Sequence, residues 1–320
     1  MPTTEEARAR LAAIPGLTVT TCTPLSGYTR FGIGGPADIY AETGSVEAFA
    51  AAMAAARASG VPTVVIGGGT NLIVSDRGFR GIVLRYRADR LAAEGRLVRA
   101  EAGAVLQDLV DFTIERGLQG LETLAGIPGS VGAALYGNAG AYGHSISERV
   151  ACVRFFDGEA VRAVGNRECE FRYRESVFKR QKEWIVLSAE LAMEAGDAAG
   201  LRQVAGEILR VRNEKFPVTM KCAGSIFKNL LFAELPAAAA AQVPPSAVRE
   251  GKVAAAWFLE QAGAKGMRRG DIHVAGYHAN LIYNGGAGTA ADLGALIGEL
   301  KARVRARFGL ELEEEVQYVG

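Results

Sequence analysis

The stretch VVIGGGTNLIVSDRG, residues 64–78, runs from a short apolar strand directly into three consecutive glycines. Consecutive small residues leave their backbone N–H groups uncovered, and such groups form nests that bind phosphate oxygens. The stretch is not a GxGxxG turn, because Leu-Ile-Val follows instead of a helical pattern, and it lacks the GK[ST] of a Walker A loop. It therefore predicts either a tight turn between two strands or a phosphate site formed by Gly67, Gly68, Gly69, Thr70 and Asn71.

A second glycine-rich stretch, GLETLAGIPGSVGAALYGNAGAYG, occupies residues 120–143. Its Ile-Pro-Gly-Ser-Val-Gly segment offers a turn, a hydroxyl and uncovered amides just before a short helical pattern, which suits a pyrophosphate near the start of a helix. The alternative is a buried loop packed through its glycines. Two such stretches without a dinucleotide fingerprint favour a dinucleotide that is held in an unusual way. The candidate contacts are Gly126, Ile127, Pro128, Gly129, Ser130, Gly132, Asn138 and Gly140.

Composition and charge narrow the class of protein. A chain of 320 residues, 49% of them hydrophobic, is long enough for two or three domains with real cores. A formal net charge of +1 provides no global field for nucleic acid or an anionic membrane. The four cysteines form no CxxC pair, so neither a zinc site nor a disulfide framework is indicated. Without a secretory signal or an apolar run of membrane length, we expect a cytoplasmic protein.

Periodicity along the chain predicts mixed α and β structure. The helix expected at 45–60 has Ser45 as its N-cap and Gly60 as its stop. A helix over 201–215 ends before Phe216-Pro217, which places a domain boundary near 215–220. Residues 233–247, rich in alanine and proline, predict an inserted loop. The remaining expected helices are a short one within 1–27 and those at 104–117, 254–263 and 290–309. The expected strands are 38–42, 63–69, 82–86, 97–103, 280–284, 312–319 and, between 150 and 192, VACVRFF, ECEFRY and WIVLSAEL.

Three further segments carry reactive side chains. Arg174, in RYRESVFK (172–179), suits a two-pronged contact with a carboxylate, although a lone arginine is commonly a solvated surface charge. Ser225, in RNEKFPVTMKCAGSIFKN (212–229), follows Ala-Gly and so is poorly shielded, which suits proton exchange with a substrate or a plain structural role. Period two in LEEEVQYV (312–319) puts Glu313 and Glu315 on one face and Glu314 on the other.

The histidines show no metal-ligand spacing, and we expect no metal site. Of the three, His278 alone lies in a site-like context, GYHANLIYN. The residues by themselves thus indicate a two-domain protein that binds a phosphorylated ligand.

Read together and in order, eight segments resemble the UDP-N-acetylenolpyruvoylglucosamine reductase family, also called UDP-N-acetylmuramate dehydrogenases. Each segment alone is weak, but eight in the same order are specific, and the resemblance runs from about residue 25 to the end. The segments are TRFGIGGPAD (29–38), VIGGGTNLIVSDRGFRGIV (65–83), the second glycine-rich stretch (120–143), YRESVFK (173–179), RNEKFP (212–217), AGSIFKN (223–229), AGAKGMRRGDIHVAGYHANLIYN (262–284) and LEEEVQYVG (312–320).

The resemblance implies an α+β protein with a two-lobed FAD-binding region of the vanillyl-alcohol-oxidase type. That region would span 1–215, with lobes at about 25–85 and 86–215. An α/β substrate-binding domain over 216–310 and a C-terminal strand over 311–320 would follow. The implied activity is reduction of UDP-N-acetylglucosamine enolpyruvate to UDP-N-acetylmuramate, with NADPH and noncovalent FAD, for peptidoglycan synthesis. The expected partners are the UDP-sugar and NADPH, with no nucleic acid and no membrane, and the expected state is a monomer.

The resemblance also assigns roles to single residues. Arg174 and Glu315 would flank the enolpyruvyl group, and Ser225 would be the general acid. A permanently cationic arginine stabilises the charge that spreads into the substrate carboxylate on reduction. An ionised Glu315 would repel that charge, so our hypothesis is that it is protonated or ordered by Arg174. Residues expected to contact nucleotide or substrate are Lys215, Asn229, His278 and Asn280.

The chain also departs from the family pattern. Gly32 stands where the family usually has a basic residue, Leu230 replaces a proline, and 231–252 is longer than expected. The short interval from Arg174 to Ser225 places the chain in the class without an extra tyrosine-bearing loop. Two alternatives are another FAD-dependent oxidoreductase on the same scaffold, such as a sugar-lactone or alcohol oxidase, and an inactive flavin-binding homologue.

Overall fold

The computed structural model describes residues 4–320, which form two compact units. The first unit comprises residues 4–23, 37–69 and 80–218, and the second comprises Pro24–Pro36, Thr70–Phe79 and Thr219–Gly320. Two short N-terminal segments therefore group with the C-terminal part of the chain. One reason is the pairing of β4 (Leu72–Val74) with the terminal strand β22 (Gln317–Val319), in parallel. The continuous ranges 1–215, 216–310 and 311–320 stay a prediction of domain boundaries.

The first sheet of the first unit has the strand order β1-β2-β5-β3. The expected helix here is α2 (Val46–Ser59), which begins where the Ser45 hydroxyl accepts the N–H of Ala48 and ends at Gly60 in the left-handed region, with φ 63°. Both predicted caps are confirmed. Strand β1 was not predicted, because its sequence TVTTCTP has no apolar alternation and its residues are largely exposed. The strands are β1 (Thr18–Pro24), β2 (Pro36–Thr43), β5 (Phe79–Tyr86) and β3 (Thr63–Ile66), and α1 (Thr4–Ala12) packs against α2.

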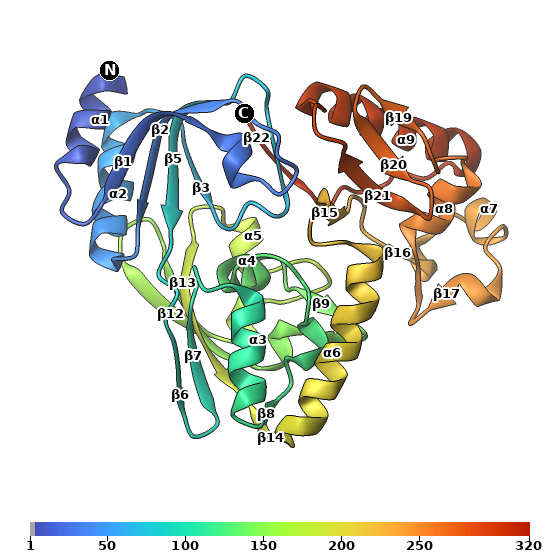
Figure 1. The fold of residues 1–320 in the computed structure, drawn as a ribbon, viewed down its shortest axis with the longest axis horizontal. Helices are drawn as coiled ribbons and strands as arrows, with labels where there is room; N and C mark the ends of the chain where they lie inside the picture. Colours follow the sequence, from blue (N-terminus) through green and yellow to red (C-terminus); the bar gives the residue numbers. More distant parts are fainter. Residues whose placement is uncertain (1–3) are drawn as a thin grey trace. The chain divides into compact units, whose positions relative to one another are not determined.

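The second sheet of the first unit is antiparallel, with the order β12-β11-β13-β7-β6. Three helices, α3, α4 and α6, belong to this lobe (Figure 1). The two sheets share one hydrophobic core, which includes Ile39 and Ile82 of the first sheet and Val98 and Val153 of the second. The bounds are β12 (Val161–Gly165), β11 (Val150–Phe156), β13 (Ile185–Ala192), β7 (Leu97–Glu101), β6 (Leu91–Glu94), α3 (Leu106–Glu115), α4 (Val131–Tyr136) and α6 (Ala198–Lys215).

The predicted strand ECEFRY (168–173) is wrong. Residues Arg167–Cys169 form a short 3-10 helix, η4, and a tight turn follows before α5 (Val177–Arg180). Glu170 and Arg174 both have positive φ, 47° and 56°, and a left-handed residue cannot continue an extended strand. Short two-stranded pairs complete the unit, namely β8 (Leu118–Gln119) with β14 (Glu194–Ala195) and β9 (Gly140–Ala141) with β10 (His144–Ser145).

The second unit is built on an antiparallel sheet with the order β15-β21-β20-β19. Its helices α8 (Ala255–Gln261) and α9 (Ala290–Phe308) pack on this sheet, around a core that includes Phe227, Phe258 and Leu300. The start of α9 is capped twice, because the Thr289 hydroxyl accepts the N–H of Asp292 and the Asp76 carboxylate accepts those of Ala290 and Ala291. The strands are β15 (Lys221–Ser225), β21 (His278–Asn284), β20 (Ile272–Ala275) and β19 (Arg268–Arg269).

Two further expectations for the second unit need correction. The segment 233–247 is not an irregular loop, since it contains α7 (Ala237–Ala240) and the 3-10 helix η6 (Pro245–Ala247). The predicted terminal strand 312–319 is shortened to β22, preceded only by an isolated bridge between Glu314 and Phe227. A small sheet of β16 (Leu230–Leu231), β18 (Lys252–Val253) and β17 (Val248–Arg249) lies beside the inserted segment in sequence. Across residues 4–320, no helix has both the length and the apolar character that a membrane span requires.

Candidate active site

The two glycine-rich stretches meet inside the first unit. A Cβ atom placed on Gly67 would lie 3.2 Å from the Ser130 Oγ, and one on Gly68 would lie 3.6 Å from the Gly129 Cα. Within residues 4–320, the N–H groups of Gly67, Gly68, Gly129 and Ser130 donate no hydrogen bond to another residue. Four unused donors at one place, with no side chain over the exposed Gly67 and Gly68, fit a bound phosphate group.

The start of α4 differs from the expected anion site. Its first N–H groups are engaged inside the chain, because Val131 donates to the Ala104 carbonyl and Gly132 to the Ala102 carbonyl, each at 2.9 Å. The Ser130 Oγ takes the next, from Ala133. A Cβ on Gly132 would lie 2.9 Å from the Cβ of Ala102, so this glycine permits close packing of α4. The unused donors thus lie before the helix and not in its first turn.

Residues 126–128 directly precede the Gly129 and Ser130 donors along the chain. Gly126 has φ 75°, a conformation that favours glycine, and its N–H donates to the Gln107 Oε1 at 2.7 Å. Ile127 packs against the core of the first unit, and Pro128 is exposed. Gly69, which ends the first glycine run, also has a positive φ of 66° and is buried.

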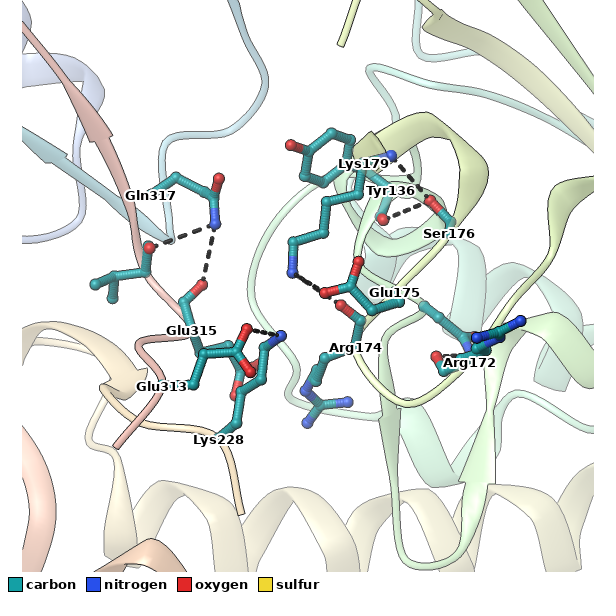
Figure 2. A network of polar contacts seen from close by, with 12 residues as sticks. Tyr136, Arg172, Arg174, Glu175, Ser176, Lys179, Lys228, Glu313, Glu315 and Gln317 are labelled. Atoms are coloured by element: carbon teal, nitrogen blue, oxygen red, sulfur yellow. Dashed lines mark hydrogen bonds and ion pairs between the residues drawn. The ribbon is translucent and has the colours of Figure 1, made fainter. Parts of the chain in front are cut away.

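Arg174 lies in a tight turn whose backbone is held by reciprocal hydrogen bonds. The Arg172 N–H donates to the Glu175 carbonyl at 3.0 Å, and the Glu175 N–H donates back to the Arg172 carbonyl at 3.1 Å. A left-handed arginine costs about 1–3 kcal/mol and persists only where the surroundings define it fully. Figure 2 shows the Lys179 side chain extending to this turn, where its Nζ lies 2.9 Å from both the Arg174 carbonyl and the Glu175 Oε1.

Other residues of the second glycine-rich stretch support the same turn. Asn138 is buried, and its Nδ2 donates to the Arg172 carbonyl at 2.9 Å. The Arg174 Nη2 donates to the Gly140 carbonyl at 3.2 Å, which points the guanidinium along this stretch. The fully buried Ser176 donates to the Tyr136 carbonyl at 2.7 Å and caps α5 (Figure 2). Asn138 and Gly140 therefore position Arg174 in the structure, whereas they were predicted as cofactor contacts.

In the second unit, Ser225 ends β15 at an irregular point of the sheet. The pairing of β15 with β21 shifts register between Cys222 and Ser225, and Gly224 has φ 77°. Such a bulge re-aims the side chain that follows it. Ser225 is half-buried, and among the described residues its hydroxyl makes no hydrogen bond with another side chain or carbonyl. The hydroxyl is thus available to a substrate.

Glu315 is brought next to Ser225 by backbone pairing. The Glu315 N–H donates to the carbonyl of Ile226, the residue after Ser225, at 2.7 Å. Asn71, predicted as a cofactor contact, holds the same segment: its Nδ2 donates to the Glu315 carbonyl at 2.8 Å, and its own carbonyl accepts the Gln317 N–H at 2.9 Å. On the same segment, Glu313 forms an ion pair with Lys228 (Figure 2), and Glu314 forms one with Lys301.

Asn280 lies inside the second unit and not on its surface. It is 2% exposed; its Oδ1 accepts the Phe227 N–H and its Nδ2 donates to the Phe227 carbonyl, each at 2.9 Å. The amide thus closes a backbone-like pair two residues after Ser225. The sequence argument predicted that this amide contacts the substrate, whereas in the structure both of its polar atoms bind the backbone of Phe227.

The remaining predicted substrate residues divide between the units. Lys215 ends α6 in the first unit, and burial, followed by the nearby Arg212, lowers the pKa of its ammonium. In the second unit, Asn229 is exposed and its Oδ1 accepts the Ala255 N–H at 3.3 Å near the start of α8. His278 is half-buried at the start of β21.

Comparison with known proteins decides the family. The chain is 69% identical over 311 residues to the UDP-N-acetylenolpyruvoylglucosamine reductase of Solibacter usitatus, covering 97% of this chain and 100% of that one. The chain belongs to the UDP-N-acetylenolpyruvoylglucosamine reductase family. The reductase of Rubrobacter xylanophilus is 39% identical, covering 93% and 94% of the two chains. A crystal structure of the reductase from Thermus caldophilus matches with a TM-score of 0.74 at 28% identity, over 95% of this chain and 99% of that one.

Two family models match separate parts of the chain. Residues 37–162 match an FAD binding domain, and residues 216–319 match the C-terminal domain of UDP-N-acetylenolpyruvoylglucosamine reductase. The predicted family and fold class, with an FAD-binding region followed by the C-terminal domain of the family, are therefore confirmed.

Lys179 is a residue of the site that the sequence argument missed. It lies inside the segment YRESVFK, which was interpreted only through Arg174. The available signal was the spacing of Glu175 and Lys179, four residues apart with the acid first, which is the favourable order for an ion pair on a helix.

Proposed function

We propose that this protein reduces the enolpyruvyl ether of UDP-N-acetylglucosamine enolpyruvate to UDP-N-acetylmuramate, a step of peptidoglycan precursor synthesis. NADPH is the reductant and FAD the noncovalently bound cofactor. The observation that carries the proposal is the group of four unused N–H donors where the two glycine stretches meet, in a chain of this reductase family. The protein acts in the cytoplasm and as a monomer. Light scattering on the purified enzyme tests the monomeric state.

The first unit has a place for the phosphates of FAD. Gly67, Gly68, Gly129 and Ser130 offer their N–H groups, and the glycines leave room for close approach. When bound and reduced by NADPH, the flavin would supply a hydride to the alkene of the enolpyruvyl group, and the addition would leave negative charge beside the substrate carboxylate.

Arg174 stabilises that negative charge. Its guanidinium is cationic at every working pH and presents a planar fork that matches a carboxylate. Its turn is held rigid and its Nη2 is tied to the Gly140 carbonyl, so the donors are already oriented before the charge forms. Preorganised donors of this kind stabilise a transition state more than solvent water does, because they need no reorganisation.

Ser225 donates the proton that completes the reduction. A serine hydroxyl is a weak acid, but the enediolate-like substrate is a strong base, so transfer is feasible at short range. The support is that the half-buried Ser225 hydroxyl makes no hydrogen bond with the described residues, and that Ser225 lies at the register shift of β15. Glu315, on the segment that pairs with Ile226, orders the substrate beside this serine. Lys215, Asn229 and His278 contact the UDP-sugar.

Anaerobic stopped-flow absorbance tests the proposed function. The flavin absorbance falls on addition of NADPH and recovers on addition of the UDP-enolpyruvyl sugar. Recovery only with oxygen and a sugar acid would replace this substrate by that of an oxidase, and no response to NADPH would indicate an inactive flavin-binding protein.

The Ser225→Ala variant tests the proton donor. We expect unchanged reduction of the flavin by NADPH and a loss of flavin reoxidation by substrate of about 10²-fold or more, the usual range for a general acid. Ser246→Ala, an exposed serine of the same unit, is the matched control and keeps both half-reactions. Equal losses in the two half-reactions of Ser225→Ala would contradict the assignment.

A further inference from the structure

We propose that Lys179 is a positioning residue for the reduction: its ammonium holds the turn Arg172–Glu175 and thereby the direction of the Arg174 guanidinium. The inference rests on the proposed role of Arg174. It adds a residue that acts through another and touches neither substrate nor cofactor itself.

The first support is the strain of the turn. Arg174 has φ 56°, a backbone conformation that a non-glycine residue rarely adopts, and two reciprocal backbone hydrogen bonds between Arg172 and Glu175 close the turn around it. A strained conformation at a functional side chain needs further contacts to stay populated. Without them, relaxation of φ by tens of degrees would swing the whole arginine side chain.

Lys179 supplies such contacts. Its Nζ donates to the Arg174 carbonyl at 2.9 Å and pairs with the Glu175 Oε1 at 2.9 Å, so it bridges two consecutive residues of the turn. The lysine side chain is only 16% exposed, and the pair is therefore partly shielded from solvent. A charged donor to a carbonyl forms a stronger hydrogen bond than a neutral one does.

The foundation of this contact is rigid. Lys179 lies in α5, whose neighbours Val177 and Phe178 are buried in the core of the first unit, Phe178 completely. The N-cap Ser176 accepts the Lys179 N–H and donates to the Tyr136 carbonyl. Because the apolar neighbours anchor the helix, removal of the lysine charge should leave the fold intact and release only the turn.

The experiment uses holoenzyme of the wild type, Lys179→Met, Lys179→Arg, Arg174→Ala and the double variant Arg174→Ala/Lys179→Met. Lys182→Met, an exposed lysine three residues further on, is the matched control. We expect Lys179→Met to slow substrate-driven flavin reoxidation by about tenfold to a hundredfold, the range expected when a charge-assisted hydrogen bond is lost. Reduction of the flavin by NADPH, flavin content and melting temperature should match the wild type. Lys179→Arg should restore most of the rate.

Two readouts separate positioning from a general structural effect. In the Arg174→Ala background, Lys179→Met should cause no further loss, because the side chain that it positions is gone. Hydrogen exchange at the amides of residues 173–176 should accelerate in Lys179→Met and not in Lys182→Met.

The outcomes distinguish this inference from the proposed function. If Arg174→Ala reoxidises its flavin as fast as the wild type, the proposed role of Arg174 fails and Lys179 has nothing to position. If Arg174→Ala is slow but Lys179→Met is fast, or if the two losses multiply in the double variant, the role of Lys179 is overturned while that of Arg174 stands. Unchanged exchange in the turn would also overturn it.

Discussion

Replacing Asn280 by alanine should destabilise the second unit and leave the first unit intact. Asn280 is 2% exposed and Phe227, whose backbone it binds, is 1% exposed. The side-chain amide satisfies both the N–H and the carbonyl of Phe227, each at 2.9 Å. In Asn280→Ala, the N–H and the carbonyl of Phe227 would be buried without these hydrogen bonds and without water to replace them.

The size of the effect follows from those two groups. A buried donor or acceptor that loses its partner costs about 1–3 kcal/mol, so the two together should cost about 3 kcal/mol or more in the free energy of unfolding. By contrast, Asn229 is exposed, and its Oδ1 accepts a long hydrogen bond from the Ala255 N–H at 3.3 Å. Asn229→Ala should cost less than about 1 kcal/mol, as surface substitutions commonly do.

Urea unfolding followed by tryptophan fluorescence measures this difference. Trp184 belongs to the first unit and Trp257 to the second, so a Trp184→Phe background reports on the second unit alone. We expect the urea midpoint of Asn280→Ala to fall by about 1–2 M, from usual denaturant slopes, with Asn229→Ala close to the parent. A loss below about 1 kcal/mol, together with a raised KM for the UDP-sugar, would refute our reasoning and restore Asn280 as a substrate contact.

Two further predictions concern the first unit. Gly67→Val should raise the Kd for FAD about tenfold or more, measured by fluorescence titration of the apoprotein. Even a Cβ at this position would lie 3.2 Å from the Ser130 Oγ, so the valine side chain should block the charge-assisted phosphate contact. An unchanged Kd would show that the phosphate does not bind here. The pKa of Asp157 is lowered by the Ala160 N–H and then by the Arg162 guanidinium, so its stabilisation is present above about pH 4, the unfolded value, and is lost as the pH falls further. Urea midpoints of Asp157→Asn should therefore vary less with pH below about 4 than those of the wild type, and parallel curves would contradict the assignment.

The sequence alone predicted those features that depend only on the residue itself and its near neighbours in the chain. Ser45 and Gly60 mark the ends of α2 because capping depends on a hydroxyl and on a residue that tolerates positive φ, and both are visible in the letters. The glycine runs indicated phosphate donors for the same reason: absence of a side chain is a property of the residue itself. The order of eight motifs then identified the family, and with it the activity and the cofactor.

Only the tertiary structure decided which polar groups remain for a ligand. Asn71, Asn138 and Asn280 look alike in sequence as amides near glycines or strands, yet each amide is used to hold a backbone segment of the chain. An amide bonds a ligand or a distant carbonyl equally well, and the choice depends on which strands meet. The left-handed conformation of Arg174 was likewise not predicted, because arginine rarely adopts it and the contacts around the turn, such as the one from Lys179, come from the folded structure. Sequence determined the kind of chemistry, and long-range pairing determined which atoms are left to perform it.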